Sequence, residues 1–98
     1  MNNLQLGKMY CMKQHFWLLF PTKETAIKLS RSGLRSAATY QDAKWLSERY
    51  NCNAVVEKNT CFVLLEVDGG YYKLLDSNGN IGWIICWNVS KYFDPVKE

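Results

Sequence analysis

The apolar residues in the second half of the chain fall into three runs, residues 62–67, 71–75 and 81–87, separated by two short polar turns. The runs are rich in β-branched, aromatic and aliphatic side chains, which is typical of β-strands. The turns at residues 68–70 and 78–80 carry glycine and asparagine, which tolerate the positive φ of a tight β-hairpin. This pattern predicts a three-stranded antiparallel meander around which the rest of the chain is organised.

Neither face of the predicted meander is polar. Because successive side chains of a strand point to opposite faces, Val63 and Leu65 share one face of the first strand, and Phe62 and Leu64 share the other. The third strand is also apolar on both sides. A sheet with two apolar faces has to be covered twice, either by helices or by folding over on itself. The sequence therefore predicts that other parts of the chain pack on both faces.

Four more short strands are predicted outside the meander, at residues 8–13, 16–20, 54–57 and 94–96. The second of these ends at Pro21, which cannot donate a hydrogen bond to a sheet. The strand at 54–57, followed by a turn at Lys58-Asn59, is expected to form a hairpin with the first strand of the meander. Residues 88–93 are expected to form a single turn of 3₁₀ helix.

Two helices are predicted between the early strands, at about residues 23–32 and 40–50. Thr22 and Thr39 precede them as N-caps, and Gly33 follows the first helix where a left-handed residue is expected. The polar segment 30–38 between the helices is expected to be a mobile loop. Together these elements predict one α+β domain over residues 1–98, with a small antiparallel sheet and two short helices.

Four short motifs near the end of the chain resemble the second half of a bacterial SH3-type barrel. Such barrels often have an aromatic strand, a turn with Asp and Gly, a Gly-Trp-Ile or Gly-Trp-Val strand, and a brief helical turn before the last strand. The matching pieces are Tyr71-Tyr72-Lys73-Leu74, Asp76-Ser77-Asn78-Gly79, Gly82-Trp83-Ile84 and Ser90-Lys91-Tyr92-Phe93. The resemblance covers roughly a quarter of the chain. It implies an SH3-like, partly open barrel with the two helices inserted, and the competing layout is an open α+β sandwich.

The composition narrows the class of protein. Of the 98 residues, 48% are hydrophobic and 14% are aromatic, which is enough for a folded core and argues against disorder. The longest apolar run, residues 16–20, is too short to cross a bilayer, and we expect no export signal at the N-terminus. The cysteines show no C-x-x-C spacing, so we expect reduced thiols in a cytoplasmic protein. They are Cys11, Cys52, Cys61 and Cys86.

No set of residues predicts a catalytic or cofactor site. His15 is the only histidine, and Cys11 is the only cysteine close to it, so a zinc site or a Cys–His pair is poorly supported. Glu66, Asp68 and Asp76 lie on or beside predicted turns, where acidic residues are expected for backbone reasons. The glycines belong to hairpins and not to a phosphate-binding loop before a helix. We therefore expect a protein that is not an enzyme and carries no metal or cofactor.

Four tryptophans and six tyrosines are more aromatic residues than one small core obviously requires. Aromatic side chains at the surface mark interaction sites, because they bury a large area at low entropic cost. The leading hypothesis is an interaction module that binds a protein partner through an aromatic surface, in the manner of an adaptor or inhibitor. Small proteins of this style are common among phage products. The predicted contact residues are Tyr71, Tyr72, Trp83 and Trp87, with the two tyrosines and Trp87 expected to be the most exposed.

The alternative hypothesis is weak, sequence-tolerant binding of nucleic acid by the segment 23–49. The net charge of +3 attracts phosphates only loosely. Binding would then depend on basic side chains of this segment and would weaken with added salt. The candidate residues are Lys28, Arg31, Arg35, Lys44 and Arg49.

Overall fold

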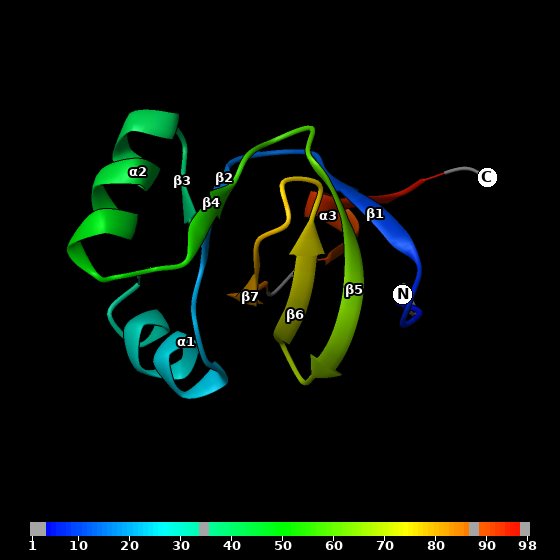
Figure 1. Cartoon of the computed structure of the whole chain (residues 1–98), viewed down its shortest axis with the longest axis horizontal. Helices are drawn as coiled ribbons and strands as arrows, with labels where there is room; N and C mark the ends of the chain where they lie inside the picture. The colour runs from blue at the N-terminus through cyan, green and yellow to red at the C-terminus, as the bar shows by residue number, and fades with distance from the viewer. Residues whose placement is uncertain (1–3, 34–35, 87–88, 97–98) are drawn as a thin grey trace.

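Two antiparallel sheets and two helices longer than one turn are present in the computed structural model, which describes residues 4–33, 36–86 and 89–96 (Figure 1). The larger sheet has five strands in the order β7-β6-β5-β1-β8, and the smaller sheet has three in the order β3-β2-β4. In Figure 1 the helices α1 and α2 lie beside the smaller sheet, while β1, β5 and β6 lie on the other side of the molecule. The predicted α+β class is confirmed.

The larger sheet contains the predicted meander, extended at one edge by the two ends of the chain. Its strands are β5 (Cys61–Asp68), β6 (Tyr71–Asp76), β7 (Ile81–Ile85), β1 (Met9–Met12) and β8 (Phe93–Pro95). Gly69 and Gly79 have φ of 63° and 84°, as the turns require. A four-residue helical turn, α3 (Val89–Tyr92), precedes β8, close to the helical turn and edge strand expected there.

The smaller sheet corrects two expectations. Its strands are β2 (Phe16–Leu19), β3 (Ser36–Ala37) and β4 (Ala54–Val56). The strand at 54–57 was expected to pair with the meander, but β4 pairs with β2, since this pairing buries Val56 completely. The segment 30–38 was expected to be a mobile loop, but its β3 residues pair with Phe16 and Trp17 at the other edge of β2.

Both predicted helices are present, and threonine caps explain where they begin. α1 spans Lys23–Ser30, and the Thr22 hydroxyl accepts the Thr25 backbone N–H. α2 spans Tyr40–Arg49, and the Thr39 hydroxyl accepts the Asp42 backbone N–H. α1 ends slightly before the predicted boundary, and Gly33 beyond it has the expected positive φ, 81°.

The core is divided into two clusters by strand β2, whose side chains alternate between them. Trp17 and Leu19 join the inner cluster, which fills the concave, inner face of the larger sheet. Leu18 and Phe20 join the helix cluster, together with Ala26 of α1 and Ala43 of α2. The helices therefore cover the outer side of β2, and the smaller sheet covers the inner face of the larger one.

The two sheets meet where Phe20 and Trp83 exchange backbone hydrogen bonds, each with an N···O distance of 2.8 Å. This contact requires Gly82, because a Cβ atom there would lie 2.7 Å from both the Leu19 side chain and the Phe20 carbonyl oxygen. Asn53 also bridges the sheets by donating from its side-chain nitrogen to the Ile81 carbonyl, at 2.6 Å. The larger sheet itself remains open, with β7 and β8 as its two edge strands, and does not close into a barrel.

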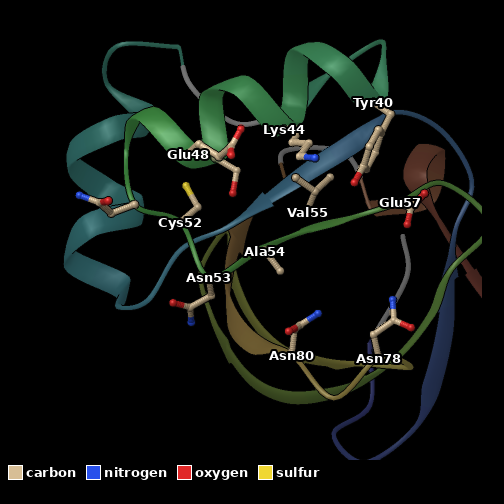
Figure 2. Close-up of a pocket in the computed structure, with 12 residues that line it drawn as sticks. Tyr40, Lys44, Glu48, Cys52, Asn53, Ala54, Val55, Glu57, Asn78 and Asn80 are labelled. Atoms are coloured by element: carbon tan, nitrogen blue, oxygen red, sulfur yellow. The ribbon is translucent and has the colours of Figure 1, made fainter.

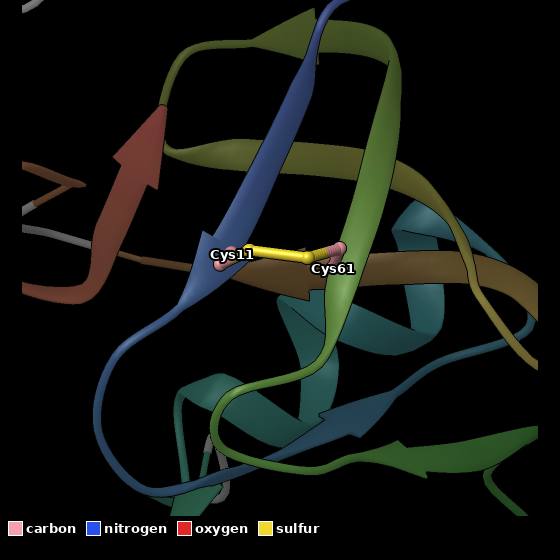
Figure 3. Close-up of a disulfide and its surroundings, with 2 residues drawn as sticks. All are labelled: Cys11 and Cys61. Carbon is pink, nitrogen blue, oxygen red and sulfur yellow. A yellow bond between two sulfur atoms is a disulfide. The ribbon is translucent and has the colours of Figure 1, made fainter. Parts of the chain in front are cut away.

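The expectation that all cysteines are reduced is wrong for two of them. Cys11 of β1 and Cys61 of β5 are directly opposite each other, with Cα atoms 4.0 Å apart, and form a disulfide (Figure 3). Direct cross-strand pairing brings two side chains on one face close together, which sequence spacing across 50 residues does not reveal. Cys52 and Cys86 remain thiols.

Candidate functional site

The predicted aromatic surface is divided between the two faces of the larger sheet. Tyr72 is only 8% exposed, on the inner face, with its ring centroid 5.7 Å from that of Phe93. The expectation that Tyr72 is exposed is therefore wrong, and burial, with a smaller contribution from Cys86, raises the pKa of its phenol. Tyr71 and Trp83 are half-buried against the helix cluster. Trp87 lies outside the described residues.

The outer face instead presents a row of apolar side chains that crosses four neighbouring strands. Met9 pairs with Val63, Val63 with Leu75, and Leu75 with Ile81. Residues paired directly across a sheet project from the same face, so these four form one continuous row. Met9 is 45% exposed and Ile81 is 47% exposed, while Val63 and Leu75 are half-buried. We refer to Met9, Val63, Leu75 and Ile81 as the outer-face row.

The row is exposed because the helices cover only one end of the outer face. Tyr71 and Trp83, toward the β7 edge, pack against the helix cluster. The outer-face row packs against neither this cluster nor the inner one within the described chain. The sequence therefore correctly indicated that both faces of the meander are apolar. The expectation that other parts of the chain cover both faces holds for the inner face, but the outer face is only partly covered.

A shallow hollow adjoins the row beside Trp83. Its volume is about 410 Å³. Its lining consists of Leu6, Glu66, Val67, Asp68 and Trp83. Leu6 is the most exposed of these apolar residues, at 61%. The hollow thus adds further apolar surface and one tryptophan alongside the row.

Ion pairs border this apolar area. Glu66 lies 3.9 Å from Lys73, the cross-strand neighbour of Trp83, and Asp68 pairs with Lys23 of α1. Beyond the disulfide, Lys13 pairs with Asp94 at 3.2 Å. Each of these carboxylates has a lysine beside it, so the border is polar without a large excess of one charge. An apolar centre with a polar border is the usual anatomy of a protein–protein interface.

The residues of the nucleic-acid hypothesis are not gathered into a comparable surface. Lys28 and Arg31 are exposed at the end of α1, and Arg35 lies outside the described residues. On α2, Lys44 shares a groove with Glu48 and Glu57. Arg49 lies 5.4 Å from the centre of the Trp45 ring and 5.7 Å from that of Tyr50. The two carboxylates therefore offset the positive charge of Lys44, and the ring contacts occupy the Arg49 guanidinium.

The cysteines and His15 are poorly placed for metal binding or nucleophilic catalysis. Cys11 is bonded to Cys61 and is not available as a thiolate beside His15. The His15 ring lies against that of Tyr92, with centroids 5.5 Å apart. Burial raises the pKa of the Cys52 thiol to about 11, which leaves very little thiolate at neutral pH. Within the described part of the chain, no three His, Cys, Asp or Glu side chains cluster as metal ligands would.

Comparison with known proteins finds no matching family model, no matching curated protein and no matching solved structure. Of the helices in the described residues, none is both long and apolar enough to cross a bilayer. The outer-face row and the hollow bring exposed apolar side chains from several strands onto one face of the molecule.

Proposed function

We propose that this protein is a non-enzymatic interaction module that binds a protein partner through the outer-face row and Trp83. The observation that supports the proposal is the register of four apolar side chains across β1, β5, β6 and β7, on a face that the rest of the described chain leaves partly uncovered. Contiguous apolar surface of this kind is a common feature of interaction sites.

The dimensions of the row fit the centre of an interface. Neighbouring strands are spaced by about 4.8 Å, so a row over four strands extends for about 14 Å. A standard interface buries about 800 Å² on each partner, with a smaller desolvated core inside it. In this proposal the row and Trp83 form the core, and the lysine–carboxylate pairs form the border. The complementary partner surface is apolar and uncharged at its centre, because an unpaired charge buried there would be costly.

Ile81→Lys provides the test, because it places a charge at the exposed end of the row. The wild-type protein and the variant are used as baits in the source cell extract, and captured proteins are quantified by mass spectrometry. Trp45→Lys is the control, since Trp45 is also exposed, at 59%, but lies on α2 away from the larger sheet. We expect a partner that the wild type and the control retain and that Ile81→Lys loses.

Two results would contradict the proposal. One is a specific partner that Ile81→Lys retains at wild-type level, and the other is loss of the partner only in the Trp45→Lys control. Self-association is measured in parallel by light scattering. If the wild type forms a dimer and Ile81→Lys is a monomer, the partner of the outer-face row is a second copy of this chain and not another protein.

The nucleic-acid hypothesis makes a different prediction in the same system. Binding of a labelled single-stranded oligonucleotide should fall steeply with salt and should drop further in an Arg31→Ala, Arg35→Ala double variant. Ile81→Lys adds a positive charge, so it should leave this binding unchanged or strengthen it. Ile81→Lys therefore separates the two hypotheses, because it should abolish binding of a protein partner but should not weaken binding of nucleic acid.

The resemblance to SH3-type barrels also remains a proposal. It is supported by the order of β6, β7, α3 and β8, which is the order that the motifs imply. Under this proposal the chain is a partly open relative of such barrels, with α1 and α2 inserted between early strands. An experimental structure in which β5 to β8 superpose poorly on SH3-like barrels would contradict it.

The cellular compartment is tested through the disulfide. A cytoplasmic protein, as the cysteine spacing suggested, would hold Cys11 and Cys61 as thiols, whereas an oxidising compartment would preserve their bond. Thiols are alkylated in intact cells before lysis, and the two cysteines are then examined by mass spectrometry. Alkylated Cys11 and Cys61 would support the cytoplasm, and a protected, bonded pair would contradict it.

A further inference from the structure

A second surface is a groove of about 470 Å³ between α2 and the β6–β7 turn. Figure 2 shows α2 along one side, Asn78 and Asn80 on the opposite side, and the chain through Ala54 and Val55 passing between them. The α2 side is formed by Tyr40, Lys44, Ser47, Glu48 and Asn51, which recur at helical spacing. The groove therefore brings α2 and β4, which follow each other in the chain, together with the more distant β6–β7 turn.

The middle of the groove is an open sheet edge. β4 pairs with β2 on one side, and no second strand pairs with it among the described residues. An edge strand presents unpaired backbone N–H and C=O groups, which an extended peptide can bind by adding a further strand. Ala54 and Val55 of this edge line the groove directly. The groove thus combines backbone hydrogen-bonding groups with walls that can contact side chains.

The wall opposite α2 is held rigid by the buried carboxylate of Asp76. One oxygen of Asp76 accepts the backbone N–H groups of Asn78 and Asn80, both at 2.9 Å, and the other accepts the Asn80 side-chain amide at 3.3 Å. Asn53 is fixed in turn by its bond to the Ile81 carbonyl. Side chains that are already ordered lose little entropy when a ligand binds. The side-chain amides of Asn80 and Asn53 are therefore already oriented for a polar peptide.

The charges of the lining favour a basic occupant. Glu48 and Glu57 contribute two carboxylates, against the single ammonium group of Lys44. The half-exposed ring of Tyr40 lies at the same groove and can pack against an aliphatic stem or a cation. An acidic ligand would be repelled by these carboxylates. A bulky apolar ligand would remove them from water without pairing their charge.

We propose that this groove binds an extended peptide segment of a partner protein, which adds as a strand to β4 and directs a lysine or arginine side chain toward Glu48 and Glu57. The segment needs no apolar anchor residues, because the walls supply mainly amide and carboxylate groups. The groove adjoins the outer-face row at the start of β7, because Asn80 of its lining precedes Ile81 and Asn53 donates to the Ile81 carbonyl.

The probe is a phage-displayed library of random ten-residue peptides, selected on the intact wild-type protein. Enriched peptides are synthesised with a fluorescent label, and their affinity is measured by anisotropy. Glu57→Lys reverses a charge in the groove, and Glu24→Lys makes the same change at an exposed position of α1 outside it. Asn78→Ala removes an amide side chain and preserves the backbone bonds of the turn.

We expect enriched peptides that carry lysine or arginine, and a Kd at least tenfold higher for Glu57→Lys. Asn78→Ala should weaken binding severalfold, while Glu24→Lys should bind as the wild type does. Amide NMR signals of Ala54 and Val55 should shift on binding. No enrichment, equal binding by Glu57→Lys, or signal shifts confined to the outer-face row would each overturn the proposal. Occupation of the β4 edge by a second copy of the chain would overturn it as well.

Discussion

The inner and outer faces of the larger sheet are built from the same strands and from similar residues, but they have opposite environments. On β6 the adjacent residues Leu74 and Leu75 show the contrast, since Leu74 is fully buried and Leu75 is half-buried at the surface. The inner face is covered by the smaller sheet, whereas the helices reach only the β7 end of the outer face. Apolar residues on a strand therefore do not by themselves show which face of a sheet is buried in the core and which stays exposed to solvent.

The faces also differ in how they are held together. Packing dominates on the inner face, where aromatic rings such as Phe62 and Phe93 meet edge to face at 5.0 Å. On the outer face β1 and β5 are joined by the Cys11–Cys61 disulfide, next to the outer-face row. A covalent bond can hold two strands in register even when the side chains on that face are only partly packed.

Replacing both bonded cysteines should have the largest effect on stability. The bond closes a loop across a separation of 50 residues. A loop of that size corresponds to about 4 kcal/mol in the chain-entropy description. We expect Cys11→Ser, Cys61→Ser to lower the free energy of unfolding by up to about that amount, measured by urea denaturation. In Cys52→Ser, which leaves the bond intact, the loss should be much smaller.

A thiol assay checks the bond itself. In denaturant without reductant, two thiols per chain should react, those of Cys52 and Cys86. If four thiols react in protein purified under oxidising conditions, the outer face has no covalent support and the contrast in how the two faces are held is lost.

The paired variants Leu74→Ala and Leu75→Ala compare the two faces directly. Leu74→Ala opens a cavity in the inner cluster and should cost about 3 kcal/mol. Leu75→Ala removes a side chain that is already partly in water and should cost about 1 kcal/mol or less. The unfolding free energies of both variants are measured by chemical denaturation, and the two substitutions lie at neighbouring positions of the same strand. Equal losses would mean that the outer face is packed as tightly as the inner face.

Gly79→Val tests the turn that keeps Leu75 opposite Ile81 in the outer-face row. Gly79 has a φ of 84°, and no atom lies within 4 Å of a Cβ placed there, so strain arises from the backbone and not from a clash. A branched residue in this left-handed conformation should cost about 2 kcal/mol, seen as a lower Tm. Gly79→Asn is the control, because asparagine tolerates positive φ, and it should lose clearly less. An unchanged Tm in Gly79→Val would show that the turn adopts another conformation.

Ile81→Lys should have the smallest effect on stability and a large effect on surface properties. Ile81 is 47% exposed at the β7 edge, so the charge can remain in water. We expect a change in unfolding free energy within about 0.5 kcal/mol. Fluorescence of an apolar dye such as anilinonaphthalene sulfonate, which binds exposed apolar surface, should fall in the variant. A strongly destabilised Ile81→Lys would place Ile81 in a packed environment.

Much of the fold could be predicted from local signals. The turn glycines, the threonine N-caps of α1 and α2, and the apolar runs of β5 to β7 each act within a few residues of sequence. They located the meander, both helices and the last strand. The pairing of β4 with β2 and the short strand β3 could not be predicted in this way, because pairing depends on which distant strand offers a matching edge.

The candidate site was harder to predict for the same reason. Alternation correctly placed Val63 and Trp83 on an apolar face, but it contains no information about what covers that face. Tyr72 was expected at the surface because it follows a turn, yet its alternate position on β6 directs it inward. The two exposed residues of the outer-face row, Met9 and Ile81, are not aromatic. A surplus of aromatic residues in the sequence therefore does not indicate them.

The most direct test of the account is the solvent exposure of methyl groups on the two faces, measured by NMR with a soluble paramagnetic gadolinium chelate. We expect strong broadening of the Ile81 methyl signals, moderate broadening for Val63 and Leu75, and protection of Leu74 and Ile84. If the outer-face row is protected as fully as Leu74 in the monomeric protein, the face is covered by the chain itself, and the claim that it is open to a partner is contradicted.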